Sequence, residues 1–161
     1  MGTRSLIGKV NEDGTVTAVY CHWDGYISHN GHILRDHYDT QDKVDQLIAL
    51  GGLSTLDEEL DKVVSYHLWR DEPIVHIELE NKQTYLEAKS YDDCCAEYLY
   101  LFENGEWFCS RRELGNDEDE EYSDNEVLDW YCLSKKEALL QQKERTLKVL
   151  ADIEQELNKL N

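Results

Sequence analysis

The densest group of chemically competent side chains lies in residues 20–32, YCHWDGYISHNGH. This segment and the residues just after it contain six side chains of types that bind zinc or another transition metal: Cys21, His22, Asp24, His29, His32 and His37. Their spacing is unfavourable, because Cys21 and His22 are adjacent and adjacent side chains of a strand point to opposite faces. The chain also has no HExxH motif and no separated CxxC pairs. We therefore predict no bound metal and no cofactor, and we interpret the segment as a strand end followed by a turn.

A pocket lined by His22, Trp23, Asp24 and His29 is the alternative reading of this segment. It would make the protein a small enzyme or a nucleotide-binding protein. The sequence contains no GxSxG motif and no glycine-rich phosphate loop. Paired carboxylates occur throughout so acidic a chain and have no diagnostic weight. We predict a protein that is not an enzyme, with the pocket as the alternative.

The acidic residues point to a different kind of chemistry. Residues 113–129, ELGNDEDEEYSDNEVLD, contain nine acids and no base. Duplex DNA carries about one charge per 1.7 Å of axis, so closely spaced carboxylates can imitate its phosphates. The four acids between Asp57 and Asp61 would extend such a surface. Neighbouring aromatic residues could anchor an interface. The predicted partner-binding residues are Asp117, Glu118, Asp119, Glu120, Glu121, Tyr122, Asp124, Glu126 and Trp130. The alternative is a solvated loop that only adds solubility.

The overall charge limits the classes of partner. Thirty-five acids and sixteen bases give the 161-residue chain a net charge of −19. Such a charge repels nucleic acid and anionic membranes and attracts basic proteins, so we predict no direct nucleic-acid binding and no membrane association. No run of eighteen apolar residues is present. The five cysteines, an odd number, and a start that does not resemble a signal peptide predict a cytoplasmic protein with reduced thiols.

The elements that would position these residues form an α+β fold. Strand-like runs at 4–10 and 15–23 flank Asn11-Glu12-Asp13-Gly14, and runs at 97–102 and 106–111 flank Asn104-Gly105. Asp-Gly and Asn-Gly between apolar alternations predict hairpins. A further strand is expected after Pro73, with alternating apolar residues from Val75. We predict an antiparallel sheet of about five strands built from hairpins, with helices on one face.

Helices are predicted in three regions before residues 113–129, here called the acidic run. Residues 30–38 have a short helical pattern, and Thr40 is placed to cap a second helix that Gly51 would end. A third helix is predicted to begin at Ser54, because Thr55 and Glu58 have the spacing of a capping box.

The last segment is predicted to be one long helix. Ser134 and Glu137 form a capping box, and the apolar stripe comprises Leu140, Leu147, Leu150, Leu157 and Leu160. From Ser134 onward six bases nearly balance five acids. We therefore divide the chain into an acidic α+β domain, 1–133, and a C-terminal helix, 134–161. The helix could fold back on the sheet or pair with a second copy to form a homodimer, which would make the protein an oligomeric structural module.

The N-terminal third carries a resemblance to a known family. Its pattern is GTRS at Gly2–Ser5, YCHWDGY at Tyr20–Tyr26, HIL at His32–Leu34 and LIALG at Leu47–Gly51. This pattern resembles a family of small accessory proteins of tailed bacteriophages, over roughly the first third of the chain. The resemblance implies a protein that acts on host machinery or host defence, and it implies no catalytic residues.

Charge and resemblance lead to one expectation. We expect an acidic phage accessory protein in the host cytoplasm that binds and inhibits a basic host protein. A nucleic-acid-binding or defence enzyme would fit, because its phosphate-binding groove would accept a carboxylate surface that imitates DNA.

Overall fold

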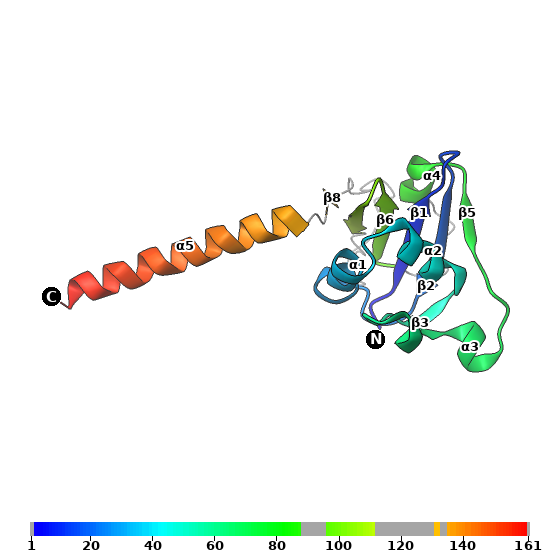
Figure 1. The fold of residues 1–161 in the computed structure, drawn as a ribbon, viewed down its shortest axis with the longest axis horizontal. Helices are drawn as coiled ribbons and strands as arrows, with labels where there is room; N and C mark the ends of the chain where they lie inside the picture. The colour runs from blue at the N-terminus through cyan, green and yellow to red at the C-terminus, as the bar shows by residue number, and fades with distance from the viewer. Residues whose placement is uncertain (1, 88–95, 112–130, 133–134, 161) are drawn as a thin grey trace, which may run out of the picture.

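The fold is described by a computed structural model, which covers residues 2–87, 96–111, 131–132 and 135–160 (Figure 1). Its centre is one mixed sheet with the strand order β4-β3-β2-β1-β6-β7-β8, and β5 also pairs with β2. The strands are β1 Ser5–Val10, β2 Val16–Cys21, β3 Leu53–Thr55, β4 Val64–Ser65, β5 Ile77–Leu79, β6 Tyr98–Glu103, β7 Glu106–Arg111 and β8 Tyr131–Cys132. The α-helices are α1 His32–His37, α2 Gln41–Ala49, α3 Tyr66–Arg70, α4 Lys82–Glu87 and α5 Lys135–Lys159; a π-helix, Ile27–Gly31, precedes α1, and a 3₁₀-helix, Leu60–Lys62, precedes β4.

Both predicted hairpins are present. β1 and β2 pair antiparallel, and in their turn Gly14 has a φ of 85° while the Asp13 carboxylate accepts a hydrogen bond from the Thr15 N–H at 3.0 Å. β6 and β7 pair antiparallel around Asn104 and Gly105, whose φ values are 52° and 80°. Both residues of this second turn need positive φ, which asparagine and glycine tolerate best.

The expectation of an antiparallel sheet of about five strands is wrong. β1 pairs with β6 in parallel, and β2 pairs with β3 in parallel at Cys21 and Leu53. The described sheet also has eight strands. Parallel neighbours need a long crossover connection, and α1 and α2 provide it between β2 and β3. Turn dipeptides predict only the pairing of adjacent strands, so they could not predict these contacts.

Helices cover both faces of the sheet, not one. On the first face, Leu34 of α1 and Val44, Leu47 and Ile48 of α2 pack against alternate residues of the strands, among them Ile7. On the opposite face lies α4, where the buried Tyr85 packs with residues of β1, β2 and β6. The Tyr85 hydroxyl donates to the Tyr100 carbonyl at 2.9 Å, which ties α4 to the middle of the sheet.

Two of the three helices predicted before the acidic run are present, and the third is not. α1 lies within the predicted 30–38, the Thr40 side chain accepts from the Lys43 N–H at the start of α2, and Gly51 follows that helix with a φ of 77°. The helix expected from Ser54 is absent, and Leu53–Thr55 is β3 instead. Both Leu53 and Leu56 are buried, so tertiary packing overrides the local capping signal.

The strand predicted after Pro73 is shorter than its apolar alternation. β5 contains only Ile77–Leu79, paired antiparallel with β2, and Val75 is exposed.

The predicted long helix is present as α5, 25 residues from Lys135 to Lys159. Ser134 of the expected capping box lies outside the described residues. α5 extends away from the rest of the fold (Figure 1), and the apolar side chains described on it are at least half exposed. The structure therefore does not show the alternative in which the helix folds back on the sheet. None of the helices in the described part of the chain is long and apolar enough to cross a membrane.

Candidate protein-binding surface

The segment rich in histidine and aromatic residues begins where β2 ends, at Cys21. The chain turns at Asp24, which has a φ of 57°, and the Gly25 N–H donates to the Thr3 carbonyl at 2.7 Å. A Cβ at Gly25 would lie only 2.8 Å from the Cβ of Ser5. The glycine is therefore required for the close approach of the two backbones.

Asn30 holds this turn together, although sequence reasoning did not single it out. Its side chain is fully buried and its Nδ2 donates to the Ser5 hydroxyl at 3.3 Å, to the Cys21 sulfur at 3.4 Å and to the Trp23 carbonyl at 3.3 Å. Its Oδ1 accepts from Nδ1 of His29 at 2.9 Å. One buried amide thus satisfies groups from three parts of the chain, which gives the segment a structural role. An asparagine before glycine reads locally as a turn, so the sequence offered no signal for this role.

The residues of the proposed pocket contact different partners. Neither His22 nor Trp23 is buried, and their rings meet edge to face at 4.7 Å. Alternation between the two faces of a strand does not apply to these two residues, because β2 has already ended at Cys21. His22 is hydrogen-bonded to the Tyr20 hydroxyl, whereas His29 contacts the Tyr26 ring. Within the described residues no group of three or more histidines, cysteines or acids is placed to hold a metal ion.

Two of the cysteines are described as buried free thiols. Burial raises the pKa of Cys21 to about 11 and that of Cys109 to about 12. A catalytic cysteine needs a lowered pKa and access to substrate. Neither thiol has these properties.

The acidic loop, Asp57–Asp61, is held in place from both sides. Leu56 and Val63 flank it and are buried in the core that α1 and α2 cover. The Tyr38 hydroxyl, from the end of α1, donates to the Asp57 carbonyl at 2.7 Å. A loop anchored at its start and its end presents its side chains in a defined arrangement.

The carboxylates of the acidic loop are positioned by local contacts. Asp57 accepts from the Glu59 N–H at 3.0 Å, and Glu59 lies 2.7 Å from the Lys62 ammonium. A carboxylate oxygen of Glu58 is 3.6 Å from His37. The loop thus presents four acids within five positions, and its own chain supplies few charges to balance them.

The acidic character extends over the rest of the fold. Residues 2–87 and 96–111 contain nineteen acids and eight bases. Six of those bases already lie within 4.0 Å of a carboxylate of the same chain: Lys9, Arg35, Lys43, Lys62, Arg70 and Lys82. An incoming basic group would therefore find many more carboxylates than competing cations.

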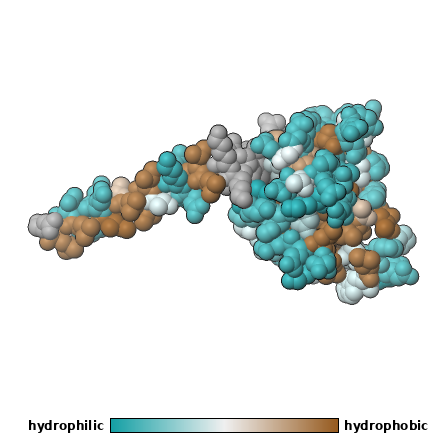
Figure 2. Space-filling view, viewed as in Figure 1, coloured by the Kyte–Doolittle hydropathy of each residue, from teal (hydrophilic) through white to brown (hydrophobic). Residues whose placement is uncertain are grey.

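An exposed apolar surface, here called the Trp69 patch, was missed from the sequence. It consists of Leu68, Trp69, Ile74 and Val75, with exposures between 47% and 70%. Hydrophobic residues are visible near α3 and β5 in Figure 2, on a face that is otherwise largely hydrophilic. The Arg70 guanidinium lies 4.2 Å from the centre of the Trp69 ring.

The part of the Trp69 patch formed by Ile74 and Val75 lies close to the end of α2. A Cβ on Gly51 would lie 2.9 Å from Ile74, and His76 Nε2 is 2.8 Å from the Ile48 carbonyl at the end of α2. Exposed tryptophan and arginine are enriched in the centres of protein interfaces. The Trp-Arg dipeptide was the signal in the sequence that could have pointed to this surface.

The predicted partner-binding residues of the acidic run all lie outside the described residues, from Asp117 through Trp130. Comparison with protein-family models, with curated proteins and with solved structures found no match to this chain.

Proposed function

We propose that this protein is a non-catalytic binding protein that recognises a basic partner protein and blocks the surface with which that partner holds nucleic acid. The observation that carries the proposal is the surplus of carboxylates on an ordered scaffold, since six of eight described bases are already paired within the chain. The resemblance of the N-terminal third to accessory proteins of tailed bacteriophages suggests that the partner is a host protein.

The physical mechanism is competition for a phosphate-binding groove. Carboxylates of the acidic loop and of residues 113–129 would lie where the partner binds phosphates. Long-range attraction between surfaces of opposite charge accelerates association, and release of counterions favours the complex. The Trp69 patch would add apolar contact, which depends little on salt.

The carboxylates and the Trp69 patch have different roles in the proposed interface. Charge gives fast association and selects basic partners, but exposed ion pairs add little affinity each. A partly exposed tryptophan that becomes buried at an interface can contribute several kcal/mol. Trp69 is 57% exposed and therefore has surface left to bury.

The test begins with capture of partners from host lysate by the immobilised protein and their identification by mass spectrometry. Binding of each purified partner is then measured with the wild-type protein and with a variant that neutralises the acidic loop: Asp57→Asn, Glu58→Gln, Glu59→Gln and Asp61→Asn. We expect the affinity to fall at least tenfold, and duplex DNA to compete with the wild-type protein for the partner.

A matched variant controls for total charge. Glu12→Gln, Asp42→Asn, Glu80→Gln and Glu87→Gln also remove four charges, but from exposed sites scattered over the fold. Equal losses of affinity in both variants would mean that only net charge matters. A partner that binds DNA and this protein at the same time would contradict the proposal.

A further inference from the structure

α5 presents an apolar face that nothing in the described structure covers. The large apolar side chains described on it, together with Leu160 directly after its end, are at least half exposed: Leu139, Leu140, Leu147, Val149, Leu150, Ile153, Leu157 and Leu160. Five of them, Leu139, Leu150, Ile153, Leu157 and Leu160, fit one register of alternating three- and four-residue steps, and Lys143 and Thr146 occupy its remaining positions. This is the spacing of a coiled-coil seam. A helix in water gains most of its stability from packing of such a face.

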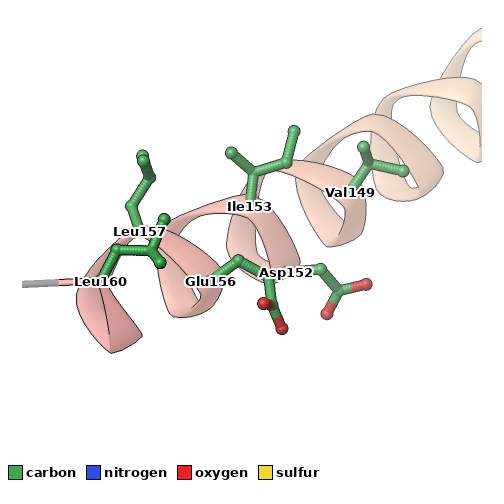
Figure 3. A pocket seen from close by; sticks show the side chains of 6 residues that line it. All are labelled: Val149, Asp152, Ile153, Glu156, Leu157 and Leu160. Carbon is green, nitrogen blue, oxygen red and sulfur yellow. The ribbon is translucent and has the colours of Figure 1, made fainter.

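The apolar face is most continuous in the second half of the helix. Val149, Ile153, Leu157 and Leu160 line a shallow hollow there together with Asp152 and Glu156 (Figure 3). A second helix lying over the apolar side chains would therefore meet carboxylates beside them. Basic side chains on that second helix would complement these two acids.

The charges of α5 are divided between its two halves. Residues 135–148 contain five bases and two acids, whereas residues 149–160 contain three acids and one base. The bases of the first half include Lys143 and Arg145, and the acids of the second half include Glu154 and Glu156. The first half of α5 therefore has the charge that complements the second half of another α5.

We propose that α5 pairs with α5 of a second copy of this chain in antiparallel orientation, independently of partner binding. A parallel pair would place basic half against basic half and acidic half against acidic half. It would also bring together two strongly acidic domains at the same end. An antiparallel pair separates these domains by the helix length, about 37 Å for 25 residues. That distance is several times the Debye length of about 8 Å at physiological salt.

The pairing is tested on the full chain by sedimentation equilibrium. We expect a dimer for the wild type, and at least tenfold weaker association for Leu150→Asp combined with Leu157→Asp. Gln155→Asp combined with Asn158→Asp adds the same charge at polar positions of the helix and should associate like the wild type. A wild type that stays monomeric at about 50 μM, or equal weakening by both pairs of substitutions, would overturn the proposal.

Orientation is tested by exchanging charges. Lys143→Glu with Arg145→Glu should weaken an antiparallel pair at least tenfold, because two acidic halves then face each other. Adding Glu154→Lys and Glu156→Lys restores opposite charges and the wild-type net charge, so association should recover. In a parallel pair the first variant would relieve repulsion between basic halves, and unchanged or tighter association would refute the antiparallel arrangement.

Small-angle X-ray scattering gives a readout that does not depend on mutation. Two domains at opposite ends of the paired helices produce a distance distribution with two separated maxima. A dimer with a single compact maximum would contradict the antiparallel arrangement. The proposal would also be contradicted if the chain stayed monomeric by itself and its α5 bound only an amphipathic helix of another protein.

Discussion

Asn30 shows how one buried polar side chain can determine the shape of a segment. Its amide meets Ser5, Cys21 and the Trp23 carbonyl, so β1, the end of β2 and the turn after it share one hydrogen-bonding group. The histidines and aromatic residues around it are then left at the surface with contacts to one another. Residues 20–32 thus form a hydrogen-bonded corner at the end of β2, with Asn30 at its centre.

Asn30→Ala should lower the free energy of unfolding by about 2 kcal/mol, because it leaves buried groups without their partner. Urea denaturation monitored by tryptophan fluorescence would measure this loss. Gln46→Ala, at an exposed position of α2, is the control and should change stability by less than about 0.5 kcal/mol. Equal stability of both variants would show that Asn30 does not organise the corner.

The two described thiols should resist alkylation in the native protein. Burial raises the pKa of Cys21 from its ordinary value of 9.0 to about 11, and that of Cys109 to about 12. Since the fold favours the protonated thiol, this contribution to stability is complete below pH 9 and is lost as the pH rises toward 11. Iodoacetamide at pH 8 followed by peptide mass spectrometry should find both residues unmodified until urea is added. Rapid native labelling of Cys21 would instead indicate an accessible, reactive thiol.

At the level of secondary-structure elements, the glycine that ends α2 is required both by the local backbone conformation and by tertiary packing. Gly51 adopts positive φ to end the helix, and its missing Cβ leaves room for Ile74 and the Val75 backbone. The same close approach holds the segment that carries half of the Trp69 patch. A single glycine thus links the end of a helix to the position of an exposed surface.

Gly51→Ala should therefore be more costly than Gly14→Ala. Both glycines have positive φ, at 77° and 85°, so both substitutions incur a backbone cost of about 1 kcal/mol. At Gly14 a Cβ would meet nothing within 4 Å, but at Gly51 it would lie 2.9 Å from Ile74. We expect a total loss of about 2–3 kcal/mol at Gly51, because crowding adds to strain. Equal urea midpoints for the two variants would show that the contact with Ile74 relaxes without cost.

At the level of the entire chain, charge is the dominant property. Residues 1–133 contain thirty acids and ten bases and so carry a net charge of −20, while six bases and five acids from Ser134 onward give +1. Both proposals start from this division: the acidic part is proposed to bind a basic protein, and the nearly neutral helix is proposed to pair with a second copy. The two proposals use different parts of the chain and can fail independently.

Neutralising part of the acidic run, which lies outside the described residues, is a second test of the binding proposal. Asp117→Asn, Glu118→Gln, Asp119→Asn, Glu120→Gln and Glu121→Gln together remove five charges with little change of shape. Affinity for the partner should fall at least tenfold and its dependence on salt should become weaker, since fewer ion contacts form. The urea midpoint of the variant is measured in parallel, so that a loss of affinity is not mistaken for a loss of stability.

Isothermal titration calorimetry at several salt concentrations would measure both quantities. Binding that tolerates these substitutions and also 0.5 M salt would exclude mimicry of phosphates. The Trp69 patch would then be the surface to test, with Trp69→Ala as the first variant.

The sequence by itself determined the features that depend on neighbours in the chain. Asp13-Gly14 and Asn104-Gly105 predict their hairpins because a tight turn needs positive φ at particular positions. Thr40 and Gly51 mark α2 because helix ends are satisfied by adjacent residues. Net charge needs no structure at all, which is why the expected class of partner could be stated first.

Tertiary contacts decided the remainder. The parallel pairing of Ser5 with Tyr98 joins strands that are far apart in the chain, and no local pattern encodes it. Ser54 opens a sound capping signal, yet the chain forms β3 there because burial of Leu53 and Leu56 outweighs a cap of about 1 kcal/mol. The roles of Asn30 and of the Trp69 patch were also decided by tertiary structure, since they depend on which distant backbone groups and side chains the fold brings close to them.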